Sequence, residues 1–211
     1  MKKNILLLSL LLTYFFSVSQ DTIRIKHTNY TTVFSKKLKY PVLVEWWETR
    51  LKIKCATPLK RKDNFKPDPS LLKYTDLSLS YKGSGYDRGH MMPAASNLCQ
   101  TSQIQDECFY FSNMSPQTHS LNAGDWKVVE TWTRDMSKDY DSIHIWSGNI
   151  GIVKKIGAVS VPKQLWKLIY IVRTKEWFGY MFENDTSSPS GIHSHLVSKE
   201  IIEKETGFKF R

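Results

Sequence analysis

The chain has 211 residues, of which 41% are hydrophobic and 24% charged, and its formal net charge is +10 at pH 7. This composition excludes a disordered or fibrous chain, and the length suits one globular domain with a sizeable core. The excess of basic residues attracts polyanions such as nucleic acid, although a basic surface kept for solubility or for adhesion to anionic envelopes is an equal alternative from charge alone.

The first twenty residues have the anatomy of a signal peptide. The segment begins with the basic residues Lys2 and Lys3. An apolar run from Ile5 to Phe16 follows, and then the small residues Ser17 and Ser19 at the expected cleavage point. The run is shorter than the roughly 18 apolar residues of a membrane span, so the competing interpretation as an anchor is disfavoured. We predict a signal peptide over 1–20 and one exported domain over 21–211. That domain is expected in the periplasm or outside the cell, without membrane attachment, and its formal charge falls by two lysines from +10 to +8.

Hydrophobic spacing and turn residues predict the elements that follow. In chain order they are a strand at Val42–Trp47, a turn-rich stretch at 55–85, a short aromatic strand at Phe109–Phe111, a helix from Asn122 to about Ser137, strands at Ile143–Gly148, Gln164–Arg173 and Trp177–Phe182, and a helix at Ser198–Thr206. No repeat or linker divides them. The mixture indicates an α+β fold with a central antiparallel sheet flanked by helices.

Three cysteines enter an oxidising compartment if the chain is exported, so one pair is expected to be bridged. We predict a disulfide between Cys99 and Cys108, because closing so short a loop contributes roughly 2 to 3 kcal/mol in the chain-entropy model. Cys55 then remains unpaired. The spacing does not match a zinc knuckle.

The densest chemical signal is the segment from Tyr86 to His90, set between Gly83-Ser84-Gly85 and Pro93. A lone histidine is more often structural than catalytic, but further residues suited to an active site follow this one along the chain. They are Asn113, Pro116-Gln117, Asn122 and Glu130. Because residues four apart share one face of a helix, we expect Asn122 and Glu130 to face the same site.

These residues resemble the motifs of the sugar-non-specific DNA/RNA endonucleases, which are ββα-metal nucleases. The resemblance is carried by Tyr86 to Pro93 and by Ser112-Asn113-Met114-Ser115-Pro116-Gln117, Leu121-Asn122, Gly124, Trp126 and Glu130, and it extends from about Tyr40 to the end. It implies that His90 is the general base, that Asn122 is the direct metal ligand and that Glu130 holds metal-bound water. Arg88 and Asn113 match supporting positions.

The chemistry of phosphodiester hydrolysis fits these residue types. A neutral imidazole, with a pKa near 6.5, can accept a proton from water around neutral pH. Mg²⁺ prefers oxygen ligands and keeps several waters, so Asn122 as a direct ligand and Glu130 hydrogen-bonded to a metal-bound water are sufficient to hold it. Mn²⁺ or another divalent ion is an alternative. An arginine can grip phosphate oxygens in two places, which suits Arg61 or Arg88.

Each assignment also has a structural alternative. Asn122 could cap the helix with Asp125 as its partner, with Ser120 as a rival cap, and Glu130 could be a solvated helix residue. Asp87 is expected to support the loop or to pair with a basic neighbour such as Arg88. The basic cluster Lys60-Arg61-Lys62 precedes Phe65-Lys66-Pro67-Asp68-Pro69, where the family places an arginine before an aromatic-x-x-Asp-Pro segment, so Arg61 is chosen. His193 and His195 are left out of the site.

The sequence therefore predicts an exported, metal-dependent nuclease that acts on DNA and RNA, leaving 5′-phosphate and 3′-hydroxyl ends as the resemblance implies. Two alternatives remain: a catalytically silent nucleic-acid-binding or adhesive protein on the same scaffold, and a phosphodiesterase acting on small nucleotides. The first is disfavoured because His90 and Asn122 are both present. The second is disfavoured because long polyanions gain most from many phosphate contacts with a basic surface.

Overall fold

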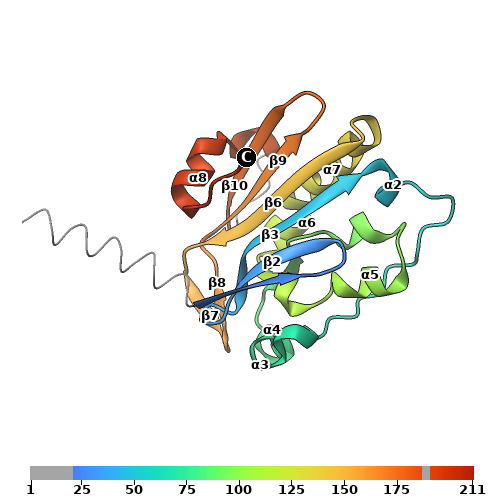
Figure 1. The fold of residues 1–211 in the computed structure, drawn as a ribbon. Coiled ribbons are helices and arrows are strands. Elements are labelled where there is room, and N and C mark those ends of the chain that lie inside the picture. Colours follow the sequence, from blue (N-terminus) through green and yellow to red (C-terminus); the bar gives the residue numbers. More distant parts are fainter. Residues whose placement is uncertain (1–20, 187–190) are drawn as a thin grey trace, which may run out of the picture.

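A seven-stranded antiparallel sheet forms the centre of the molecule (Figure 1). The structure is a computed structural model that describes residues 21–186 and 191–211, so the predicted signal peptide lies outside the described residues. The strands, in their order across the sheet, are β1 (Thr22–Lys26), β2 (Tyr30–Ser35), β3 (Tyr40–Thr49), β6 (Ser142–Ile150), β9 (Gln164–Ile171), β10 (Glu176–Glu183) and β11 (Leu196–Val197). The four strands predicted from the sequence at β3, β6, β9 and β10 are confirmed, and the fold is α+β.

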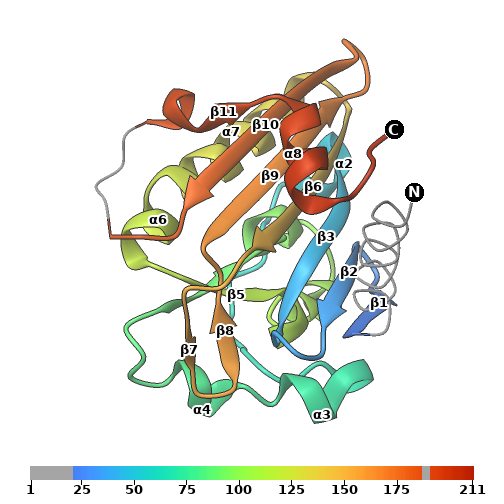
Figure 2. The same ribbon diagram turned by 90° about the vertical axis from the view of Figure 1, so that its left-hand side faces the viewer.

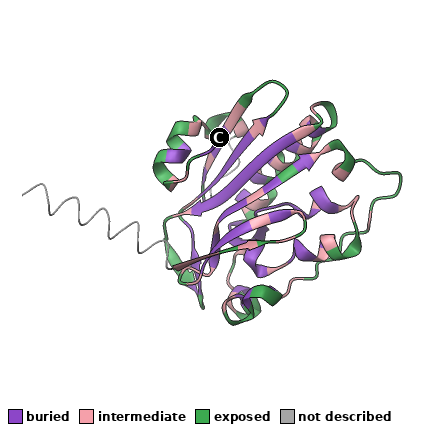
Figure 3. Cartoon of the chain, in the orientation of Figure 1, coloured by how far each residue is buried: buried purple, intermediate pink, exposed green. Residues whose placement is uncertain are grey.

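The two faces of this sheet carry different layers of the core. On one face Ile145 and Ile169 pack with Trp126 and Val129 of α7 (Asp125–Asp139). On the other face Trp166 and Leu168 pack with Ile202 of α8 (Lys199–Thr206). Side chains alternate between the faces of a strand, so the central strands bury residues on both sides (Figure 3). Figure 2 shows α7 and α8 on either side of the sheet.

The last helix has the ends that the sequence predicts. The Ser198 hydroxyl accepts a hydrogen bond from the Ile201 N–H at 3.4 Å, and Gly207 follows the helix with φ 75°. A left-handed residue after a helix favours glycine because it has no Cβ.

A second, two-stranded sheet lies beside α6 (His119–Ala123) and α7, and it consists of β4 (Asp87–His90) and β5 (Met114–Gln117). The predicted strand at Phe109–Phe111 is wrong, since Phe111–Asn113 forms a 3-10 turn and the strand begins at Met114. The apolar run of aromatic side chains fills the core instead of pairing in a sheet: Phe109 and Phe111 are both 0% exposed.

The predicted helix from Asn122 to Ser137 is present as two helices instead of one. The chain breaks at Gly124, whose φ of −97° and ψ of −123° lie outside the helical region, so α6 ends at Ala123 and α7 starts at Asp125. Asn122 and Glu130 therefore do not share one continuous helix.

The predicted turn-rich stretch at 55–85 contains only short helical segments. The remaining elements of the described residues are α2 (Arg50–Ile53), η1 (Pro69–Leu71), α3 (Leu72–Thr75), α4 (Ser78–Tyr81), η2 (Ala94–Asn97), α5 (Ser102–Glu107), η3 (Phe111–Asn113), β7 (Lys154–Ile156), β8 (Val159–Val161) and η4 (Ile192–His195). Among the residues described, no helix is long and apolar enough to cross a membrane.

The disulfide joins Cys55 to Cys99, so the prediction of a bridge between Cys99 and Cys108 is wrong. The segment between Cys99 and Cys108 folds into α5, which turns the Cys108 thiol into the core, where it contacts the Asn97 amide and the Met92 sulfur. Burial raises the pKa of this thiol to about 12. Loop length alone could not reveal which Cβ atoms face one another.

Breaking the observed disulfide is expected to destabilise the protein. A bridge across a sequence separation of 44 residues contributes about 4 kcal/mol in the chain-entropy model. The double variant Cys55→Ser/Cys99→Ser should lower the free energy of unfolding by an amount of that order, measured by urea denaturation. Cys108→Ala is the matched control, because it should leave the response to a reducing agent unchanged. A wild-type midpoint that does not move when the reductant is added would contradict the pairing.

Candidate active site

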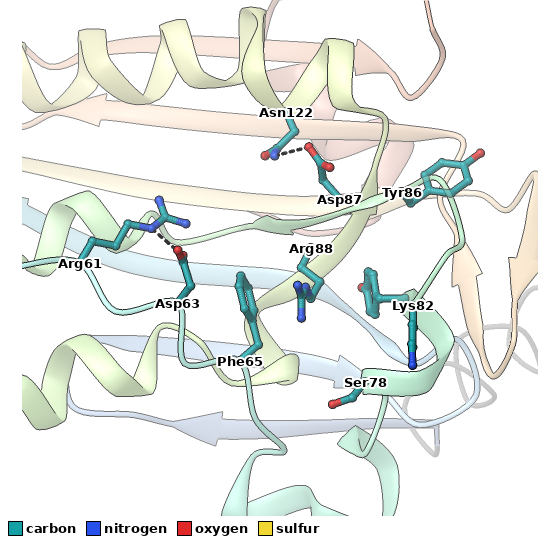
Figure 4. A pocket seen from close by; sticks show the side chains of 10 residues that line it. Arg61, Asp63, Phe65, Ser78, Lys82, Tyr86, Asp87, Arg88 and Asn122 are labelled. Carbon is teal, nitrogen blue, oxygen red and sulfur yellow. Dashed lines mark hydrogen bonds and ion pairs between the residues drawn. The ribbon is translucent and has the colours of Figure 1, made fainter.

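All predicted site residues except Asn113 line one cleft between the 55–85 stretch, β4, the end of α6 and α7. Two adjoining hollows of about 480 and 270 Å³ share three residues, Arg61, Arg88 and Asn122. We call the two hollows together the site cleft. Figure 4 shows its larger part, with Arg61, Arg88 and Asn122 around it. His90 and Glu130 line the smaller hollow.

His90 is fixed at the end of β4 by contacts on several sides. Its ring packs against Phe65 and Phe109, with ring centroids 5.6 and 4.9 Å away. The Trp126 indole donates a hydrogen bond to the His90 carbonyl oxygen at 3.2 Å, which ties α7 to β4. Gly89 precedes the histidine because a Cβ at this position would collide with the buried Gln117 side chain on β5. The backbone and the ring are thus both held before any substrate arrives.

The electrostatic surroundings keep the His90 imidazole neutral. Burial lowers its pKa from 6.5 to about 3, the nearby Arg61 guanidinium adds to this effect, Asp63 opposes it, and Arg88 contributes a smaller lowering. The Nε2 atom is buried without a hydrogen-bond partner in the described part of the chain. The ordinary histidine pKa expected from the sequence is therefore corrected downward, and the ring has an unprotonated nitrogen at neutral pH.

Asn122 is held by Asp87 and does not cap a helix. Its amide nitrogen donates a hydrogen bond to Asp87 Oδ2 at 2.8 Å, and the same oxygen lies 2.9 Å from His119 Nδ1. The residue before α6 is Thr118 and the residue before α7 is Gly124, and neither makes a side-chain capping bond. The capping alternatives, with Asn122 or Ser120 as the cap, are wrong. With its nitrogen turned to Asp87, Asn122 has its carbonyl oxygen at the other end of the amide, available to a cation.

Glu130 and Asn122 line the same hollow even though the helix breaks between them, which confirms the expectation that they face one site. The Glu130 side chain is 14% exposed, so it is not the solvated helix residue of the alternative interpretation. Burial raises the pKa of its carboxyl group, and Lys167 and Arg134 oppose that rise. Lys167 Nζ is 3.9 Å from Glu130 Oε1.

The two arginines lie on aromatic rings at the mouth of the cleft. The Arg88 guanidinium is 4.1 Å from the centroid of Phe65, and Asp87 pairs with His119 and Asn122 instead of Arg88. Arg61 Nε is 2.9 Å from Asp63 Oδ1 in an exposed ion pair, and its guanidinium lies 5.6 Å from the centroid of Phe109. Both side chains can turn their remaining N–H groups to a phosphate.

Asn113 supports the site from outside the cleft. Its amide oxygen accepts a hydrogen bond from the Met92 N–H, and its amide nitrogen donates to the carbonyl oxygens of Met92 and Cys108, each at 2.9 Å. These bonds fix the backbone that follows His90. His195 lies 3.0 Å from Asp125 and packs on Phe182, which agrees with leaving it out of the site.

Some residues of the cleft were not predicted. Phe65, Lys127 and Arg134 line it, and Lys167 lies behind it. For Arg134 a signal existed, because it follows Glu130 by one helical turn. Lys167 had no such signal, because a lysine within the apolar run of a strand does not reveal which buried group it contacts.

The oxygen atoms of the cleft fit a hydrated hard cation. The described residues contain no group of three or more His, Cys, Asp or Glu side chains that could hold a metal ion. The Asn122 amide oxygen and the Glu130 carboxylate lie in one polar hollow, and oxygen donors of this kind suit a hydrated divalent cation.

Comparisons with known proteins agree with this geometry. A sequence model of the family described as DNA/RNA non-specific endonuclease matches residues 9–211. "Nuclease EXOG, mitochondrial" of Xenopus laevis is 37% identical over 126 residues, which are 53% of this chain and 35% of that protein. "Nuclease 1, mitochondrial" of Schizosaccharomyces pombe is 31% identical over 198 residues, 85% of this chain and 58% of that protein. "Nuclease" of Nostoc sp. is 30% identical over 166 residues, 72% and 60% of the two chains. The chain thus spans between 35% and 60% of the length of these relatives.

The fold has a match among solved structures. A chain in a crystal structure of the EndoG/EndoGI complex superimposes with a TM-score of 0.79 and 25% sequence identity, over 89% of this chain and 84% of that chain. The predicted ββα-metal nuclease fold is confirmed.

Proposed function

Since the chain belongs to the DNA/RNA non-specific endonuclease family, we propose that it is a nuclease that hydrolyses the phosphodiester bonds of DNA and RNA without strong sequence specificity. The observation that carries the proposal is the convergence of a neutral histidine, a carbonyl oxygen and two guanidinium groups on one cleft: His90, Asn122, Arg61 and Arg88. These are the groups that activate water, anchor a cation and neutralise phosphate.

In this mechanism His90 is the general base. Its unprotonated imidazole takes a proton from the attacking water, while Arg61 and Arg88 neutralise the phosphate. A phosphate in the cleft adds negative charge beside the same guanidinium groups that lower the His90 pKa. The substrate therefore raises that pKa toward the range in which imidazole is an efficient base.

Asn122 and Glu130 are proposed to hold the divalent ion, with Mg²⁺ as the first choice and Mn²⁺ as an alternative. The Asn122 carbonyl oxygen would bind it directly, and the Glu130 carboxylate would accept hydrogen bonds from its waters. When bound, such an ion neutralises the phosphate and stabilises the departing oxygen. Departure of the 3′ oxygen leaves 5′-phosphate and 3′-hydroxyl ends.

The proposed lack of base specificity has a direct test. No base-reading motif is apparent in the sequence, and the site cleft offers arginines and lysines, which contact phosphates and position without specifying. Purified protein with Mg²⁺ should degrade unrelated plasmids and RNA to smears, with rates that fall steeply as salt rises, and a chelator should stop it. Discrete bands at a few defined sites would contradict the broad specificity, and cleavage of dinucleotides alone would favour the small-nucleotide phosphodiesterase.

We also propose that the mature protein is residues 21–211, exported to the periplasm or the medium. The basic and apolar start of the sequence supports export, and so does the Cys55–Cys99 disulfide, since disulfides persist in oxidising compartments. Intact-mass analysis of fractionated cells should find a processed, oxidised chain outside the cytoplasm. An unprocessed, reduced chain in the cytoplasm would contradict export.

A further inference from the structure

Lys167 is a buried lysine on β9, directly behind the site cleft. Its side chain is 0% exposed, and its Nζ has no hydrogen-bond partner in the part of the chain that the structure describes. An ammonium group without water and without hydrogen-bond acceptors is costly to bury, so a compensating charge or aromatic face is required.

Glu130 is the charge closest to Lys167. The two side chains approach to 3.9 Å between Nζ and Oε1, and the ammonium also lies 4.1 Å from the ring centroid of Trp126, one turn before Glu130 on α7. The other buried carboxylate near Lys167, Glu48, is already held by the Trp46 indole at 3.3 Å and the Ser96 hydroxyl at 2.9 Å. Glu130 is therefore the carboxylate whose position Lys167 can fix.

We propose that Lys167 is a positioning residue, whose buried ammonium holds the Glu130 carboxylate at the wall of the site cleft. There Glu130 would accept hydrogen bonds from the waters of the divalent ion. This role rests on the proposed function, because Glu130 acts only through metal-bound water. Because Lys167 is on β9, the charge that holds Glu130 comes from the large sheet and not from the ββα segment that contains His90 and Asn122.

The surroundings of Glu130 explain why such support is needed. Burial raises the pKa of its carboxyl group, and the cations that oppose this effect are Lys167, then Arg134 on α7 and Arg61 on the 55–85 stretch. Burial likewise lowers the pKa of Lys167 to about 8, against the effect of Glu130 and Glu48. The two opposite charges thus attract one another across the 3.9 Å between Nζ and Oε1, and the ammonium itself is held over the Trp126 ring, so the carboxylate has a fixed partner on the sheet.

Lys167→Met tests the role, because methionine keeps the unbranched stem over Trp126 and removes the charge. Mn²⁺ binding is measured by titration calorimetry without nucleic acid. We expect the dissociation constant to rise roughly 10- to 100-fold, as for other groups that orient metal-bound waters or ligands. Lys167→Arg, which keeps the charge, should recover part of this loss. Lys163→Met, an exposed lysine just before the same strand, is the matched control and should bind Mn²⁺ like the wild type. Unchanged Mn²⁺ affinity in a folded Lys167→Met variant overturns the proposal.

A double-variant cycle separates positioning from general damage to the fold. In the Glu130→Gln background, Lys167→Met should cause no further loss of Mn²⁺ affinity, whereas an equal loss in both backgrounds overturns the role. If Lys167→Met does not fold, Lys167→Gln takes its place: a Mn²⁺ dissociation constant raised by a similar factor supports the role, and an unchanged one overturns it.

The outcomes distinguish this inference from the proposed function. If the wild-type protein binds no Mn²⁺ and cuts no nucleic acid, both the proposed nuclease function and the role of Lys167 are wrong. If the wild type binds Mn²⁺ and cuts nucleic acid, but Lys167→Met binds Mn²⁺ equally well, only the role of Lys167 is wrong.

Discussion

His90→Ala is expected to lower kcat at least roughly 10²- to 10⁴-fold, the contribution ascribed to general bases. The arginines around the cleft cannot replace it, because a guanidinium group donates hydrogen bonds and has no acceptor atom for a proton, and in the proposed mechanism the Glu130 carboxylate holds the waters of the cation. Binding of nucleic acid in the presence of Mg²⁺ should persist, since the phosphate contacts of the arginines remain. Plasmid cleavage rates and filter or anisotropy binding measure the two quantities separately.

His193→Ala is the matched control for that variant, because His193 is exposed on η4 and lies away from the cleft. It should cut and bind like the wild type. If His90→Ala has near-normal turnover, His90 is not the general base and another residue must accept the proton. Loss of binding together with cutting, at an unchanged melting temperature, would contradict the separation of the two roles.

The lowered pKa of His90 adds a stability signature to the same variant. The unfolded chain binds a proton on this histidine near pH 6.5, whereas the folded chain binds it only near pH 3. The neutral ring therefore contributes full stability above pH 6.5, and that contribution is lost as pH falls through this window. The melting temperature of the wild type should fall more steeply between these pH values than that of His90→Ala, measured by scanning calorimetry.

The part of the site that lies in short sequence motifs was predictable. The motifs around His90 and from Asn113 to Glu130 indicate a metal-dependent nuclease site through their resemblance to those of the endonucleases, and the structure brings His90, Asn122 and Glu130 to one cleft. The large sheet was partly predictable, since β3, β6, β9 and β10 are long runs of apolar and aromatic residues. The sequence-based assignment began at Val42 and missed β1 and β2, although Thr22–Lys26 alternates in character.

Two kinds of feature were not predicted: a local change of backbone conformation, and contacts between residues far apart in the chain. Helical periodicity continues through Gly124, so it could not show that this residue leaves the helical region and splits α6 from α7. The disulfide of Cys55 depends on where η2 and α2 bring the two thiols, which spacing does not contain. The pairing of Lys167 with Glu130 depends on α7 crossing β9, so only the three-dimensional structure reveals it.

Asn122→Ala is expected to require roughly 100-fold more Mg²⁺, or more, for half-maximal activity, because losing a direct ligand should cost at least as much as losing a group that orients one. The fold should remain, since Asn122 caps no helix and the hydrogen bond of its side-chain amide within the described residues goes to Asp87. Mn²⁺ titration without substrate and the Mg²⁺ dependence of cleavage measure the effect.

Asn29→Ala is the matched control for the lost hydrogen bond, because the Asn29 amide donates to Asn97 at 2.8 Å and does not line the cleft. It should leave the metal dependence unchanged. Asn122→Asp is informative as well: it supplies an anionic oxygen but sets a second carboxylate against Asp87, so the repulsion opposes the gain in ligand charge. If Asn122→Ala has the metal dependence of the wild type, the amide serves only to hold Asp87, and the cation must be anchored by another oxygen of the cleft.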